Sequence, residues 1–215
     1  MTSIHASAAP PRFEWRTITA LLALCAVPVA AGAVRLHALA AGGPVNPANL
    51  RFFQAPLPIS VHIVSATLYC VLGALQFSTS LRLRYPRSHR MGGVLAASCA
   101  VLAALTGVSM TLALGWSGPL QGPLLWGARL LSAGAMALAI AVGLAAIARR
   151  QLRRHRLAML HAWAIGAGAG TQVLVSAPFL VFQGSVDGLL RDALMAAGWL
   201  INLAVAQWLS RRRPR

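Results

Sequence analysis

Lysine is absent from this chain of 215 residues, and acidic residues are nearly so. All 19 basic side chains are arginine, against three acids, Glu14, Asp187 and Asp192. So few carboxylates provide neither a proton relay nor a carboxylate cage for a metal ion, which argues against ion-coupled transport and metalloprotease chemistry. The HExxH motif, a phosphate-binding glycine loop and a GxSxG elbow are also missing from the sequence.

Charge of either sign is scarce as well. Only 10% of the residues are charged, whereas 58% are hydrophobic and the mean hydropathy is +0.68. Soluble domains are typically about 25% charged. A net charge of +16 would suggest nucleic acid as the partner of a soluble protein, but here the arginines lie between apolar runs. We therefore expect a membrane protein whose partner is the lipid bilayer and not nucleic acid.

The three cysteines, Cys25, Cys70 and Cys99, each lie within an apolar run and show no CxxC spacing. This pattern is typical of small buried hydrophobic side chains, and it implies no disulfide framework.

Six apolar segments are long enough to cross a hydrocarbon core of about 30 Å as helices. Turns rich in glycine and proline separate them. The segments run over residues 17–40, 58–81, 91–116, 123–148, 157–182 and 189–209. The sequence thus predicts an all-α, polytopic transmembrane bundle of six helices over 17–209, with an N-terminal segment 1–16 and a basic tail 210–215. The first segment exceeds the h-region of a signal peptide, about 7–15 residues, so we expect an uncleaved anchor.

The arginines indicate the orientation of this bundle. They gather before the first segment, between the second and third, between the fourth and fifth, and after the sixth. With six helices all four regions fall on one side, and retained arginine marks the cytoplasmic side. We therefore expect both termini in the cytoplasm, a bacterial inner membrane as the location, and anionic lipid headgroups as contacts of the arginine loops.

The second segment carries a polar stripe. Five of its residues fall within one arc of about 80° on a helix: His62, Ser65, Tyr69, Gly73 and Gln76. Such a stripe faces the bundle interior, because polar groups are costly against lipid. One interpretation is interhelical hydrogen bonding; the other is a cofactor, substrate or proton path lined by His62.

Two further histidines, His89 and His155, stand at the cytoplasmic starts of the third and fifth segments. Each heads a face of small residues, and the second face includes the GxxxG pair Gly166–Gly170. Small residues allow close helix packing, which is one interpretation. The same grooves can instead admit a flat macrocycle with imidazole as its axial ligand.

The remaining polar positions are weaker candidates. His161 points about 120° away from His155 on a helix, and His37 lies at the outer end of the first segment. His62 lies about 28 Å along its helix from the cytoplasmic end, so it belongs to a different level from His89 and His155. A single site that joins all three is excluded, whereas two stacked sites are not.

Arg129 lies inside the fourth segment, about two turns from its outer end. We expect its side chain to reach outward to the membrane surface or to pair with Asp187 or Asp192.

Several of these elements together resemble an uncharacterised bacterial membrane family, domain of unknown function 2306. The resemblance covers about residues 58–173 and rests on His62-Ile63, Gly73-Ala74-Leu75-Gln76-Phe77, Arg82, Arg84, Pro86, His89-Arg90-Met91-Gly92, His155-Arg156 and Met159. It implies a polytopic membrane protein of unassigned activity, with His62, Gln76, His89 and His155 at matched positions. Ala158 and His161 stand where the family usually has tryptophan and arginine. The histidine layout also loosely resembles di-haem cytochromes of the b561 type.

These patterns lead to a haem b-binding, electron-transfer protein as the first hypothesis. His89 and His155 would act at the cytoplasmic level, and His62, with His37, at the outer one. The alternative is a non-redox membrane protein, either a small-molecule permease or an assembly subunit. A third hypothesis, a lipid-modifying enzyme with His62 as general base, lacks a nucleophile and a carboxylate partner. A homo-oligomer or a redox partner is compatible with each hypothesis, and the sequence identifies neither.

Overall fold

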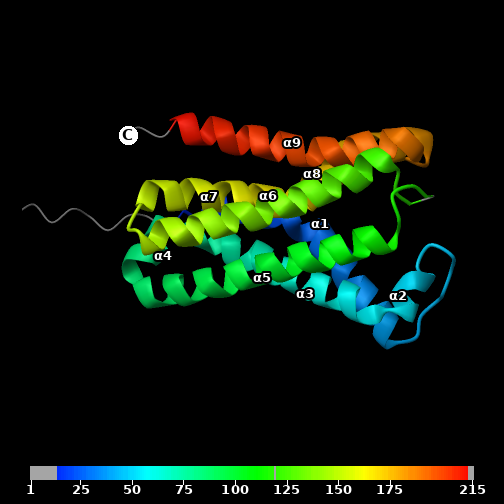
Figure 1. Ribbon diagram of the computed structural model, residues 1–215, viewed down its shortest axis with the longest axis horizontal. Coiled ribbons are helices and arrows are strands. Elements are labelled where there is room, and N and C mark those ends of the chain that lie inside the picture. The colour runs from blue at the N-terminus through cyan, green and yellow to red at the C-terminus, as the bar shows by residue number, and fades with distance from the viewer. Residues whose placement is uncertain (1–13, 119, 213–215) are drawn as a thin grey trace, which may run out of the picture.

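The computed structural model describes residues 14–118 and 120–212. Most of the predicted N-terminal segment, 1–13, and the end of the basic tail, 213–215, lie outside the described residues. Within the described part the chain forms long helices that run side by side (Figure 1). The helices are α1 (Trp15–Ala40), α2 (Leu50–Gln54), α3 (Pro56–Gln76), α4 (Thr79–Arg84), α5 (Pro86–Ala113), α6 (Pro123–Ala148), α7 (Leu152–Gly166), α8 (Gly168–Gln183) and α9 (Gly188–Arg212).

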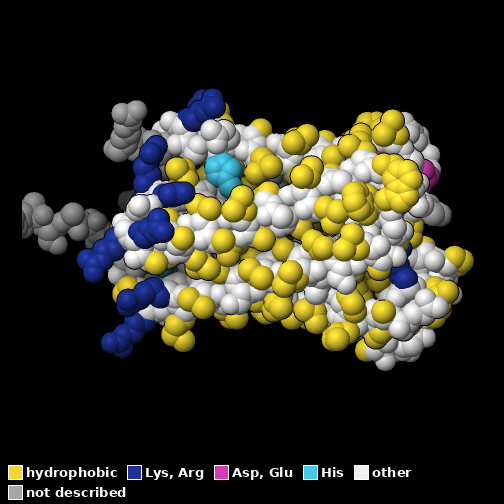
Figure 2. All heavy atoms as spheres, viewed as in Figure 1, with side chains coloured by type: hydrophobic (Ala, Val, Ile, Leu, Met, Phe, Trp, Pro, Cys, Tyr) yellow, Lys and Arg dark blue, Asp and Glu magenta, His cyan; other side chains and the backbone are white. Residues whose placement is uncertain are grey.

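The spans agree with the predicted helix bundle. Helices α1, α3, α5, α6 and α9 are each long and apolar enough to cross a membrane, and α7 and α8 pass the same test only as a pair, which is bent by 42° at its break, so the structure has five or six candidate spans. Hydrophobic side chains cover the long sides of the molecule in Figure 2, while arginines gather at one end. Large apolar side chains such as Leu131 (75% exposed) and Val34 (69% exposed) point outward. This is the surface that a lipid bilayer solvates, so the prediction of an all-α polytopic membrane protein is confirmed.

The fifth predicted segment is not one helix. It breaks at Ala167, whose N–H still donates to the carbonyl of Trp163 at 2.8 Å. The break falls in the run Gly166-Ala167-Gly168-Ala169-Gly170, where three glycines weaken the helix. Gly166 and Gly170 consequently belong to different helices, so the prediction that they form a GxxxG pair on one helical face is wrong.

The connection between the second and third predicted segments also differs from the prediction. Helix α3 ends at Gln76, and a separate short helix α4 follows, with the Ser78 hydroxyl accepting a hydrogen bond from the Leu81 N–H at 3.2 Å. Ser78 thereby caps the start of α4. Pro86 then occupies the first turn of α5, where a missing N–H is tolerated, and α5 therefore begins five residues earlier than predicted.

Helices α3, α5, α6 and α7 form a four-helix core. Helix α5 packs on α3 and α6, and α7 packs on α6 and α3. Helix α1 covers α3 and α8, while α9 covers α6, α7 and α8. In the four-helix core, α5 and α7 therefore occupy one diagonal, and α3 and α6 occupy the other.

Glycines hold these helices close together. The ring of Trp163 lies over Gly73, the ring of Tyr69 lies over Gly166, and the carbonyl of Leu24 in α1 faces Gly170. Because lipid chains are as apolar as leucine, such close packing, and not a hydrophobic drive, holds membrane helices together.

A substitution at Gly170 tests this close packing. In Gly170→Ala the new methyl group would collide with the backbone carbonyl of Leu24, which cannot move without displacing α1. We expect a loss of about 1–3 kcal/mol of stability, as for other overpacked cores. Gly134→Ala is the matched control, since an added methyl group there meets no atom within 4 Å. Thermal unfolding in detergent should show a lower midpoint for Gly170→Ala and an unchanged or higher one for Gly134→Ala; equal midpoints would refute the close approach.

Glu14 ties the start of α1 to α4. Its carboxylate accepts hydrogen bonds from the Ser78 hydroxyl at 2.9 Å, the Thr79 N–H at 3.1 Å and the Ser80 N–H at 3.5 Å. The carboxylate thus sits at the N-terminus of a helix, where backbone N–H groups favour negative charge. Burial opposes its ionisation, but the hydrogen bonds from these three residues outweigh burial and lower the pKa of Glu14 to about 2. This contact fixes the turn from which α5 and its His89 begin.

The pH dependence of stability tests the Glu14 anchor. Because folding lowers the pKa of Glu14 from 4.5 to about 2, its contribution is complete above pH 4.5 and is lost as the pH falls through 2. We expect Glu14→Gln to be less stable than wild type at neutral pH and to lose part of the acid sensitivity in this window. Asp187→Asn removes an exposed acid as a control and should keep the wild-type profile. Thermal unfolding at a series of pH values measures these profiles. Identical profiles for Glu14→Gln and wild type would contradict the role of Glu14 as an anchor.

Candidate functional site

The two ends of the bundle differ in charge. One end, which we call the arginine-rich end, contains the α4–α5 turn, the α6–α7 turn and the end of α9 (Figures 1 and 2). His89 and His155 lie at this end, each as the fourth residue of its helix, α5 or α7. The two predicted cytoplasm-side histidines therefore stand at one level of the molecule, on diagonally opposed helices of the four-helix core.

The ring of His155 is fixed by a backbone group. Its Nδ1 lies 2.9 Å from the carbonyl oxygen of Gly143 in α6. A carbonyl only accepts hydrogen bonds, so Nδ1 carries the proton and the lone pair lies on Nε2. Histidines that bind metals are oriented in this way, by a hydrogen bond from the nitrogen that does not ligate.

His89 lies on α5, which is diagonally opposed to the α7 helix of His155. Its half-buried ring lies within electrostatic range of Arg82 of α4 and of His155. The two histidines therefore lie at one level of the four-helix core, on helices that are not neighbours. Together they form what we call the imidazole pair, His89 and His155.

Gln76, a member of the predicted polar stripe, covers the glycines next to His89. A methyl group built on Gly92 would lie 3.1 Å from the Gln76 Nε2, and one built on Gly93 would lie 3.2 Å from its Oε1. The side chain of Gln76 supplies every atom within 4 Å of these two methyl positions. The space over Gly92 and Gly93 is thus closed by the far end of one flexible side chain.

Farther into the bundle the small-residue faces are filled by rigid side chains. Tyr69, which is 5% exposed, packs on Gly166, and Trp163 packs on Gly73. Trp163 also contacts Phe77 edge to face, with ring centroids 5.6 Å apart. For these levels of the grooves, helix packing accounts for the small residues, and the ring of Tyr69 is part of that packing.

His62 joins α3 to α5 near the other end. Its Nδ1 lies 2.9 Å from the carbonyl oxygen of Ala103 and 3.1 Å from the Thr106 hydroxyl. The ring also packs on Gly107, where an added methyl group would lie 3.4 Å from the His62 Cε1. His62 therefore makes the interhelical hydrogen bond that one interpretation of the polar stripe expected, at a level different from the imidazole pair.

The two weaker histidine candidates lie apart from these positions. His161 uses both ring nitrogens, with Nδ1 2.8 Å from the Leu157 carbonyl and Nε2 3.2 Å from the Gln207 side chain of α9. It points away from His155, as its helical spacing predicts. His37 is exposed in the last turn of α1.

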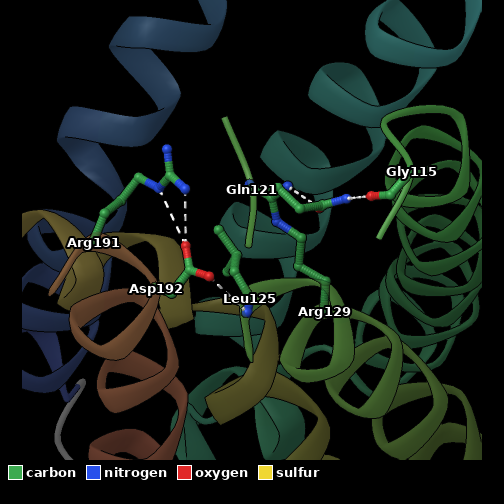
Figure 3. Close-up of polar contacts among 6 residues, drawn as sticks. All are labelled: Gly115, Gln121, Leu125, Arg129, Arg191 and Asp192. Atoms are coloured by element: carbon green, nitrogen blue, oxygen red, sulfur yellow. Dashed lines mark hydrogen bonds and ion pairs between the residues drawn. The ribbon is translucent and has the colours of Figure 1, made fainter. Parts of the chain in front are cut away.

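A polar network that the sequence did not predict lies at the end opposite the arginine-rich end (Figure 3). Arg129 donates to the Gln121 Oε1 at 2.6 Å. Asp192 instead pairs with Arg191 at 3.0 Å and accepts the Leu125 N–H at 3.2 Å. The expected pairing of Arg129 with Asp187 or Asp192 is therefore wrong, because Asp192 caps the start of α6 and an amide takes its place. Gln121 lies in a Gly-Pro-rich turn, and no pattern in the sequence distinguishes it.

Comparison with known proteins places the chain in a family. A family model described as "Predicted membrane protein (DUF2306)" matches residues 59–210, a segment that contains the imidazole pair, His62 and Gln76. Neither the curated proteins nor the solved structures yield a match. The matched segment extends beyond the range 58–173 from which the resemblance was inferred. Since it covers most of the chain, this protein belongs to the DUF2306 family of predicted membrane proteins.

Proposed function

We propose that this multi-pass membrane protein binds a haem at its arginine-rich end, where His89 and His155 would hold it, and serves electron transfer. The observation that carries the proposal is the imidazole pair itself, two rings on diagonally opposed helices at one level. Four-helix bundles hold cofactors through side chains of facing helices in this way. A haem held by two imidazoles supplies one-electron transfer at its iron.

The residues around the imidazole pair are compatible with this group. The Gly143 carbonyl orients His155 so that its Nε2 lone pair is available for ligation. Beside Gly92 and Gly93 the flexible Gln76 side chain is the group that an added methyl would meet, so rigid side chains do not fill the face of α5 directly there. Arg82 and Arg90, at the same end, match the carboxylates that a haem carries.

The outer level does not suit a second haem. His62 is hydrogen-bonded across to α5, and its ring lies on Gly107, so the groove there is filled by the histidine itself. His37 lies at the end of α1, outside the four-helix core. The proposal therefore includes one haem per chain, and it assigns His62 to the packing of α3 on α5.

The proposal also includes the orientation. The arginine-rich end would face the cytoplasm of a bacterial cell, with the protein in the inner membrane and both termini inside. The support is that most of the arginines gather at one end of the structure (Figure 2).

The break between α7 and α8 is the feature that a permease would use. Transporters bind substrates where interrupted helices line a cavity. Here the break is filled: the ring of Trp199 lies over Gly168, and the Leu24 carbonyl faces Gly170. Irregular backbone inside a membrane is tolerated when protein covers it, so the break is accounted for without a substrate.

An absorbance spectrum tests the haem proposal. Protein purified from iron-replete cells should give haem bands in a reduced-minus-oxidised difference spectrum. His89→Ala and His155→Ala should each lose most of these bands, because each removes one of two axial ligands. His161→Ala is the matched control, since this imidazole lies in α7 but is hydrogen-bonded to Leu157 and Gln207. The haem bands of this variant should stay at the wild-type level. A spectrum without haem bands, or bands that survive both substitutions, would rule the proposal out.

A further inference from the structure

Arg129 lies inside the bundle at the end opposite the arginine-rich end. It is the seventh residue of α6, which begins at Pro123, so its backbone lies about 9 Å along the helix, and its guanidinium reaches back toward Gln121 in the preceding turn. A cation at such a depth in a membrane protein is costly and usually has a partner or a function.

A buried amide holds the Arg129 guanidinium in place (Figure 3). Gln121, which is 1% exposed, donates from Nε2 to the carbonyls of Thr111 and Gly115. These two hydrogen bonds fix which way the amide points, so its oxygen faces Arg129 and accepts at 2.6 Å. The guanidinium carries five N–H groups, and the neutral amide oxygen accepts from one of its nitrogens.

The charges around Arg129 are mainly positive. Arg51 and Arg191 repel it, while Asp192 attracts it. The carboxylate of Asp192, however, is engaged by Arg191 and the Leu125 N–H. Of the residues that the structure describes, Arg191 and Asp192 form the only salt bridge, so the charge of Arg129 has no carboxylate of its own.

Arg51 and a further cation, Arg35, lie on the side of α2. Arg51 and Arg35 both stack on Phe52, with their guanidinium carbons 4.3 Å and 5.1 Å from the ring centroid. The end of α1 and the short helix α2 thus add two cations to the end of the molecule at which α6 and Arg129 begin (Figure 1).

We propose that this region binds an oxyanion, a carboxylate or a phosphate, through the Arg129 guanidinium, with Arg51 as a second cationic contact. A guanidinium presents parallel N–H groups that match two oxygens of such a group. The anion would supply the negative charge that Arg129 lacks. Two sources share this chemistry, the headgroup of an anionic lipid and a free anion from the aqueous phase. The site lies at the other end of the molecule from the imidazole pair and does not depend on haem.

The experiment uses the full chain in two arms. In the first arm, isothermal titration with inorganic phosphate at constant ionic strength measures the dissociation constant in detergent. In the second arm, native mass spectrometry after exposure to phosphatidylglycerol and phosphatidylcholine measures the lipid that stays bound. Arg129→Gln keeps a polar side chain beside Gln121 but removes the charge. Loss of one charge-assisted contact should weaken binding about tenfold to a hundredfold.

Controls separate the site from general attraction by arginine. Arg153→Gln removes an exposed charge at the arginine-rich end and should bind inorganic phosphate like wild type in the first arm. Arg51→Gln changes the short helix α2, outside the spans, and should weaken binding severalfold even if Arg129→Gln does not fold. Phosphate binding that needs Arg129 or Arg51 supports a free anion, and phosphatidylglycerol retention that needs them supports a lipid headgroup. Wild type that binds neither probe, or variants that bind both like wild type, would overturn the proposal.

Discussion

Close approach of helix backbones at glycine is the interaction on which the rest of this structure depends. In a bilayer the helices gain little from burying apolar side chains against each other, so they associate where large side chains fit onto small ones. Trp163 on Gly73 and Tyr69 on Gly166 join α3 to the α7–α8 bend in this way. These contacts define the four-helix core, and its two diagonals determine which polar side chains can meet.

Several polar side chains inside the bundle are oriented in the same way, by a hydrogen bond to a main-chain carbonyl. His155 and His62 each direct Nδ1 at a carbonyl of a neighbouring helix, and Gln121 directs its amide at two carbonyls before it receives Arg129. Such bonds satisfy polar groups away from water and also fix the direction of the remaining nitrogen or guanidinium. At the arginine-rich end the result supports a haem-binding pair, and at the opposite end it supports an anion site.

Much of this fold could be predicted, because length and hydropathy alone determine a membrane span. Helical spacing also separated His62 from His89 and His155, and it directed His161 elsewhere. The features that could not be predicted from the sequence depend on contacts between segments that are far apart in the chain. The break at Ala167 falls in a glycine run whose residues contact α1 and α9, and the contact of Gln76 with Gly92 follows from the pairing of α3 with α5. Gln121 as the partner of Arg129 requires a turn geometry that no local pattern encodes.

A single haem held between α5 and α7 is the function that we propose. Its direct test is the haem content, measured as pyridine haemochrome against protein determined by amino-acid analysis. We expect one haem per chain in protein from iron-replete cells. A ratio of two would contradict it by requiring an outer site around His62, and a ratio of zero would leave the imidazole pair without the role proposed for it.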